Sequence, residues 1–138
     1  MQIAPYLFFN GNARDAATFY ADVFGVDVPE FMTMDGAPPE MNVPENRKGW
    51  IMHCTMQIGD YQLMMSDDFM ANSPPMAGCN VQLNFETAAE GKRVFDALSA
   101  GGEVRMPWEP TFWSAGFGAF SDKFGVRWMI GTDEPPAN

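Results

Sequence analysis

The chain has 138 residues, of which 46% are hydrophobic and 14% aromatic, and it has a formal net charge of −10. This length and apolar content indicate one globular domain and exclude a disordered chain. The acidic charge repels phosphate groups and the eight Lys and Arg form no cluster, which excludes nucleic acid and anionic membranes as expected partners. No apolar run is long enough to span a membrane, and the N-terminal residues lack the basic segment of a signal peptide, so we expect a cytoplasmic protein.

The first half of the chain predicts a strand, a helix and further strands. Residues 3–9 (IAPYLFF) form the first expected strand, and Asn12 is placed to cap a helix that ends at Gly25. Residues 28–34 predict a weaker strand. The polar, Pro-rich residues 35–49 predict a loop that can cover a site. Two strands then follow, joined by a hairpin turn at Gly59-Asp60.

The second half repeats this order. Residues 79–85 (CNVQLNF) predict a strand, and Thr87 with Glu90 forms a capping box at the start of a helix. Gly101-Gly102 ends that helix. Three more strands are expected, at residues 103–108, 116–121 and 126–132, before a frayed tail at 133–138.

One constant shift aligns identical residues at several positions of the two halves. A shift that places Leu7 on Leu83 also places Phe9 on Phe85 and Gly25 on Gly101. We therefore predict an α+β fold of two βαβββ modules, at residues 1–68 and 79–132, within a single domain of residues 1–138.

Cysteine and methionine usage adds two expectations. Cys54 and Cys79 are the only thiols, and without secretory features we expect both to be reduced and buried. The twelve methionines can be flexible core filler, or they can form an adaptable lining for a ligand or a partner chain.

Three stretches resemble a known family. They are PYLFFNGNARDAATFYADVFG, IGDYQLMMSDD and TFWSAGFGAFSDKFGVRWMI, and together they are similar to the PhnB-like branch of the vicinal-oxygen-chelate superfamily, which includes glyoxalases, bleomycin-resistance proteins and extradiol dioxygenases. The resemblance implies a half-open cup with helices outside, and a homodimer. Members are often labelled demethylubiquinone methyltransferases, but this chain has no Gly-rich strand–turn–helix for S-adenosylmethionine.

The resemblance also implies where a divalent metal would bind. The four ligand positions of metal-dependent relatives fall on Pro5, Met65 or Ser66, Asn80 and Met129. Proline has no side-chain donor, an amide is a weak ligand and a thioether prefers soft metals. Because the chain has a single histidine, no two-His site can exist within one protomer. We therefore expect no metal cofactor, and a divalent metal in an unconventional site is the alternative.

Period-two alternation predicts which side chains share a polar sheet face. That face either meets solvent or, as the resemblance implies, lines the cup and binds a small polar or anionic organic molecule. The residues expected on it are His53, Thr55, Gln57, Asn80, Gln82, Asn84, Arg127 and Met129.

A few residues have more specific candidate roles. His53 is the default acid or base, although it can also be an ordinary strand histidine with satisfied hydrogen bonds. Phe112 and Trp113 can cap the mouth of the cup or pack in a dimer seam. Gly116 and Gly118 either leave room for a ligand or another backbone, or belong to an ordinary bent strand. Asp122 is expected to cap its SDKFG turn, and Trp128 is expected in the core.

Three functions follow. The leading hypothesis is a homodimeric protein that binds a small organic ligand without a metal. The alternatives are a lyase, isomerase or oxygenase that uses His53, and a non-catalytic module that sequesters a toxic compound.

Overall fold

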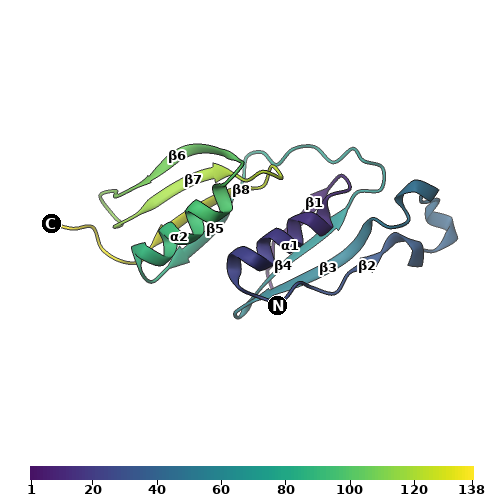
Figure 1. Cartoon of the computed structure of the whole chain (residues 1–138), viewed down its shortest axis with the longest axis horizontal. Coiled ribbons are helices and arrows are strands. Elements are labelled where there is room, and N and C mark those ends of the chain that lie inside the picture. Colours follow the sequence, from purple (N-terminus) through teal and green to yellow (C-terminus); the bar gives the residue numbers. More distant parts are fainter. The chain divides into compact units, whose positions relative to one another are not determined.

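A computed structural model describes the whole chain, Met1–Asn138. It divides into two compact units, Met1–Pro74 and Pro75–Asn138. Each unit consists of one mixed four-stranded sheet and one helix, which confirms the predicted α+β fold of two βαβββ modules (Figure 1). No helix has the length and apolar character needed to cross a membrane.

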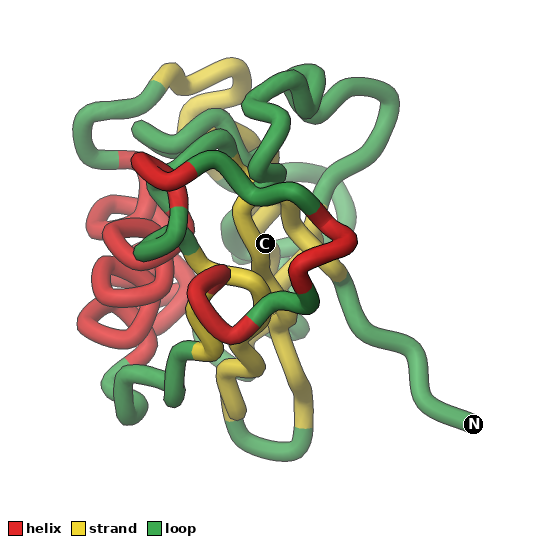
Figure 2. The backbone as a smooth tube through the Cα atoms, turned by 90° about the vertical axis from the view of Figure 1, so that its right-hand side faces the viewer, coloured by secondary structure: helices red, strands yellow, loops and turns green.

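The sheet of the first unit has the strand order β1-β4-β3-β2. Its elements are β1 (Tyr6–Phe9), α1 (Ala13–Phe24), β2 (Met32–Thr33), β3 (Ile51–Ile58) and β4 (Tyr61–Asp67). β1 pairs with β4 in parallel, and the β3–β4 hairpin turns at Gly59-Asp60 as predicted. The expected strand at 28–34 is reduced to two residues. The predicted loop contains three short helical turns, at Met34–Gly36, Pro39–Met41 and Glu45–Arg47 (Figure 2).

The sheet of the second unit has the equivalent order β5-β8-β7-β6. Its elements are β5 (Val81–Phe85), α2 (Ala88–Ser99), β6 (Glu103–Glu109), β7 (Phe117–Ser121) and β8 (Arg127–Thr132). β5 pairs with β8 in parallel, as β1 does with β4. The edge strand β6 is irregular, because its register against β7 shifts on both sides of Met106.

Each helix packs on one face of its own sheet. α1 buries a row of small residues together with Tyr20 and Val23, and it contacts β3 and β4. α2 buries Val94, Phe95 and Leu98, and it contacts all four strands of its sheet. Phe120, Trp128 and Ile130 fill the second core, as expected for Trp128. The sheet face opposite the helix is called the open face of each unit below.

The start of each helix is bound by a carboxylate from the end of the last strand of its unit. Asn12 precedes α1 but its side chain makes no capping bond, so the predicted Asn12 cap is wrong. The buried Asp67 accepts the N–H groups of Gly11 and Ala13 instead, and its other oxygen accepts from Ile51. In the second unit, Glu134 accepts from Ala88 at 2.7 Å, in addition to the predicted cap from Thr87.

Gly116, which precedes β7, and Gly118 within it make room for core side chains rather than for a ligand. A Cβ on Gly116 would lie 2.1 Å from Cζ2 of Trp108, and one on Gly118 would lie 2.5 Å from Cε2 of Phe95. Both rings contact each other on the helix side of the sheet, with centroids 5.8 Å apart. The expected close approach is therefore real, but an indole and a phenyl ring of the same unit make it.

Asp122 has the structural role that the SDKFG turn predicts. Its Oδ1 accepts the N–H groups of Phe124 and Val126, and its Oδ2 accepts the indole N–H of Trp128 at 2.9 Å. Gly125 takes a positive φ of 86° in this turn.

Candidate functional site

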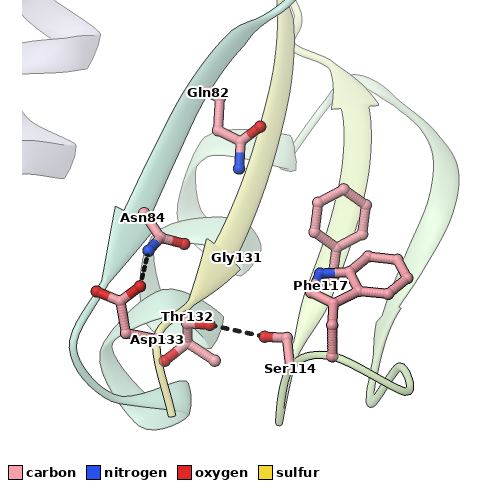
Figure 3. Close-up of a pocket in the computed structure, with 8 residues that line it drawn as sticks. Gln82, Asn84, Ser114, Phe117, Gly131, Thr132 and Asp133 are labelled. Atoms are coloured by element: carbon pink, nitrogen blue, oxygen red, sulfur yellow. Dashed lines mark hydrogen bonds between the residues drawn. The ribbon is translucent and has the colours of Figure 1, made fainter. Parts of the chain in front are cut away.

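A pocket of about 470 Å³ opens on the open face of the second unit, within the size range of small-molecule sites (Figure 3). Its residues come from β5, β7, β8, the loop that precedes β7 and the residue that follows β8. They are Gln82, Asn84, Trp113, Ser114, Phe117, Gly131, Thr132 and Asp133.

The register of three neighbouring strands builds the floor of the pocket. Asn84 on β5 and Phe117 on β7 both pair with Gly131 on β8, which lies between them. A Cβ added to Gly131 would lie 3.2 Å from Oδ1 of Asn84 and 3.3 Å from Cδ2 of Phe117. The absence of a side chain at position 131 therefore keeps the space between the amide and the phenyl ring open.

The polar groups of the pocket differ in how far the protein already satisfies them. The side-chain amide of Gln82 makes no hydrogen bond within the protein, so it is free to donate and accept. The Asn84 amide nitrogen donates to Asp133, which orients its oxygen toward the floor (Figure 3). Ser114 is buried, and its hydroxyl oxygen lies 2.8 Å from the carbonyl of Thr132 and 2.9 Å from that of Gly116. With its proton held by backbone carbonyls, Ser114 is a structural residue and not a free nucleophile.

Aromatic rings form one wall. Trp113 is 53% exposed, and its ring meets that of Phe117 edge-on, with centroids 5.5 Å apart. Phe112 is 90% exposed and packs against Trp113, but it does not line the pocket. Of the two predicted aromatic residues, only Trp113 therefore borders the cavity.

The other predicted residues of the second unit lie farther along the same open face. Met129 pairs with Gln82, and Arg127 lies at the start of β8. Nε of Arg127 donates to the carbonyl of Cys79, while Oδ1 of Asn80 accepts from Nη2 of Arg105. None of these residues lines the pocket. Sequence reasoning missed Arg105, although Glu103 and Arg105 alternate with Val104 and Met106 and this alternation was a signal for a shared polar face.

Three of the predicted residues belong to the first unit. His53 lies between two hydroxyl groups: Nδ1 is 2.8 Å from the phenol oxygen of Tyr6, and Nε2 is 3.0 Å from Oγ1 of Thr55. The rings of Tyr6 and His53 are also in contact. Gln57 is held by the hairpin, because it donates to Gly59 and accepts from Gln62. The histidine is thus fully hydrogen-bonded, as its ordinary structural role predicts, yet its partners are groups that can relay a proton.

The two cysteines have different environments. Both are free, but Cys54 is buried and Cys79 is exposed, so the expectation that both are buried is wrong for Cys79. Burial, and secondarily the negative charge of Asp67, raise the pKa of Cys54 to about 11. Because the thiolate is the reactive form, Cys54 is an inert core residue.

The residues present do not fit the divalent metal that the resemblance implies. Pro5 has no side-chain donor, and the side-chain oxygen of Asn80 already accepts from the guanidinium of Arg105, with the positive charge of Arg127 nearby. A cation at Asn80 would face two like charges. The structure also contains no group of three or more His, Cys, Asp or Glu side chains that could hold a metal ion.

Comparisons with known proteins agree with this fold. The model of the Glyoxalase/Bleomycin resistance protein/Dioxygenase superfamily matches residues 2–130, and the chain belongs to this superfamily. Protein YjdN of Escherichia coli (strain K12) is 34% identical in an alignment of length 141 that covers 94% of this chain and 94% of that protein.

Two solved structures also resemble the chain closely. Protein PA1353 from Pseudomonas aeruginosa is 43% identical, with a TM-score of 0.84 over 97% of this chain and 98% of that one. The PhnB protein from Bacillus cereus is 26% identical, with a TM-score of 0.78 over 96% and 99%. These likenesses are consistent with the PhnB-like branch that the sequence resembles.

Proposed function

We propose that the protein binds a small polar organic molecule in the pocket of the second unit and does so without a divalent metal. The observation that carries this proposal is the combination of an unsatisfied amide at Gln82, an oriented amide at Asn84 and an open floor at Gly131. Neutral amides give hydrogen-bond specificity, and the edge of Trp113 offers apolar contact to a ring or an alkyl group.

The pocket supports binding better than it supports chemistry. Ser114 is held by backbone carbonyls, and the pocket contains neither a histidine nor a cysteine that could activate a nucleophile. A non-catalytic sequestration protein therefore remains one form of the same proposal. The predicted homodimer and the cytoplasmic location stay predictions, which light scattering and cell fractionation would check.

A ligand screen by thermal shift tests the proposal. A compound that binds only the native state stabilises that state by about 2.7 kcal/mol when its free concentration is one hundred times its Kd, and this shift is easily measured. We expect Gly131→Ala to weaken binding of such a compound, because the new methyl group would enter the floor of the pocket. Gly36→Ala is the matched control, since a Cβ at that position meets nothing within 4 Å.

Two results would contradict the proposal. One is a compound that binds with equal affinity to the wild type, Gly131→Ala and Gln82→Leu. The other is stoichiometric zinc, iron, manganese or nickel in protein purified without chelators, measured by mass spectrometry.

The second candidate function is acid–base catalysis by His53. It is favoured by the hydrogen-bonded chain from Tyr6 through His53 to Thr55. An imidazole can both accept and donate a proton, so either hydroxyl can exchange a proton with it. Conversion of a screened ligand to a product, detected by mass spectrometry and lost in His53→Gln, would favour this function over simple binding.

A further inference from the structure

We propose that Arg105 and Arg127 form an oxyanion subsite on the open face of the second unit. There they bind the carboxylate or phosphoryl group of the ligand whose uncharged part occupies the pocket. This inference rests on the proposed function, and it adds the charged group of the ligand and the residues that bind it.

Hydrogen bonds place Arg105 on the open face although it comes from the edge strand. Its Nη1 donates to Oγ of Ser121 at 2.6 Å, and its Nη2 donates to Oδ1 of Asn80 at 3.1 Å and to the carbonyl of Phe120 at 3.1 Å. Ser121 pairs with Arg127 across the β7–β8 ladder, so the two arginines meet on the same surface. Glu103 pairs with Ser121 and Val104 pairs with Phe120, so alternation along β6 places Arg105 on the same face as Ser121, next to the register shift between Val104 and Met106.

Neither arginine is neutralised by a carboxylate. Neither has an acidic oxygen within ion-pair distance, whereas the exposed Lys92 and Arg93 of α2 pair with Asp96 and Glu90. Partial burial lowers the pKa of Arg105 and the charge of Arg127 lowers it further, while Glu103 acts in the opposite direction. In a chain with 18 acidic and eight basic residues, two adjacent and unpaired guanidinium groups are unusual, and an anion between them would relieve their repulsion.

The guanidinium groups are held in place but keep donors free. A guanidinium has five N–H donors. Arg127 uses only Nε, which donates to the carbonyl of Cys79 at 3.2 Å, so its terminal fork remains unused. Arg105 has three acceptors and keeps its Nε–H and one N–H of Nη1. Such a fixed fork matches the two oxygens of a carboxylate or a phosphoryl group.

The spacing along β8 defines the length of the ligand. Every second residue of β8 lies on the open face, at Arg127, Met129 and Gly131. Successive members of this row are about 6.6 Å apart along the strand. Gln82 pairs with Met129, so it lies about 7 Å along the strand from Arg127, and the pocket floor lies about 13 Å away. The ligand is therefore an organic oxyanion with a polar, ring-sized group beyond its charged end.

The test compares four probes at constant ionic strength: 4-phenylbutyrate, 3-phenylpropylphosphonate, uncharged 4-phenylbutanamide and inorganic phosphate. Binding is followed by thermal shift and by chemical-shift titration of nitrogen-15-labelled protein. We expect the organic anions to bind more tightly than the amide. Arg127→Gln should lower their affinity at least about tenfold, because a charge-assisted bidentate contact is lost. The preferred anion identifies the group as a carboxylate or a phosphoryl group.

Controls separate the subsite from folding and from net charge. Arg14→Gln removes one positive charge from the first unit, where Arg14 lies over the ring of Phe31, and it should leave anion binding unchanged. Arg105→Gln should also weaken anion binding. Because Arg105 makes three hydrogen bonds within the protein, the melting temperature of this variant without ligand must be measured too. Arg127→Gln loses a single bond and gives the clearer result.

The outcomes distinguish this inference from the proposed function. Anion binding that survives both Arg127→Gln and Arg105→Gln overturns the subsite, as do equal affinities for 4-phenylbutyrate, 3-phenylpropylphosphonate and 4-phenylbutanamide. If Gly131→Ala leaves binding of the amide intact while Arg127→Gln still removes anion binding, the pocket assignment fails and the subsite stands. No response to any probe overturns both.

Discussion

The two units have the same strand order and register but present different chemistry on their open faces. Tyr6 pairs with Met64 as Gln82 pairs with Met129, so these two residues occupy equivalent positions. Phe8 pairs with Ser66 as Asn84 pairs with Gly131, so Phe8 and Asn84 are also at equivalent positions. The first unit thus has stacked aromatic rings beside a histidine, where the second has two amides around a glycine floor.

This difference shows how a duplicated scaffold separates geometry from chemistry. Backbone pairing fixes where each open-face side chain lies, and substitution at equivalent positions then changes what that face can bind. Bulky residues fill the space in the first unit, while small and amide residues leave a pocket in the second. Three experiments test how far the two units differ, in order of decreasing expected effect.

The largest effect is expected at the carboxylates that bind the helix starts. Asp67 is 3% exposed and accepts three backbone N–H groups, so Asp67→Ala leaves buried donors without partners and should cost about 3 kcal/mol or more. The exposed Glu134 accepts one, and Glu134→Ala should cost less than about 1 kcal/mol. Urea unfolding followed by circular dichroism measures both. Equal losses would contradict the inferred difference between the units.

An intermediate effect is expected where a glycine meets an indole. Gly116→Ala places a methyl group 2.1 Å from Trp108, and we expect a loss of about 1–3 kcal/mol from overpacking. The first unit has a similar contact, in which a Cβ on Gly11 would lie 2.7 Å from Trp50. The midpoint of thermal unfolding reports the loss, with Gly36→Ala as control. An unchanged midpoint for Gly116→Ala would show that Trp108 moves aside at no cost.

The smallest effect on stability is expected from Tyr6→Phe. The Tyr6 side chain is half-exposed, and its hydrogen bond to His53 is open to solvent. Losing this hydrogen bond should therefore lower the free energy of unfolding by less than about 1 kcal/mol. Nuclear magnetic resonance of the imidazole should nevertheless show a changed tautomer balance, since one of its two partners is gone. An imidazole signal identical to that of the wild type would mean that the Tyr6–His53 bond does not form in solution, and would weaken the catalytic alternative.

Much of the fold could be predicted from local sequence patterns. Apolar alternation, the glycines that end both helices, the Gly59-Asp60 turn and the Asp122 turn all concern residues close together in the chain. The same patterns recur in the second half at the shift that places Leu7 on Leu83, and this repeat indicated two modules. Parity along β5 and β8 also placed Gln82, Asn84, Arg127 and Met129 on one face, as the structure has them.

Tertiary structure alone decided the rest, because the contacts concerned join residues far apart in the chain. Asp67, rather than the adjacent Asn12, binds the start of α1, and Trp108, rather than a ligand, explains Gly116. Ser114, Thr132 and Asp133 border the pocket, and a hydrogen bond to Ser121 holds Arg105 beside Arg127. Local periodicity reports which face of its own strand a side chain occupies. It does not report which distant side chain contacts that face, and in this protein such long-range contacts form the site.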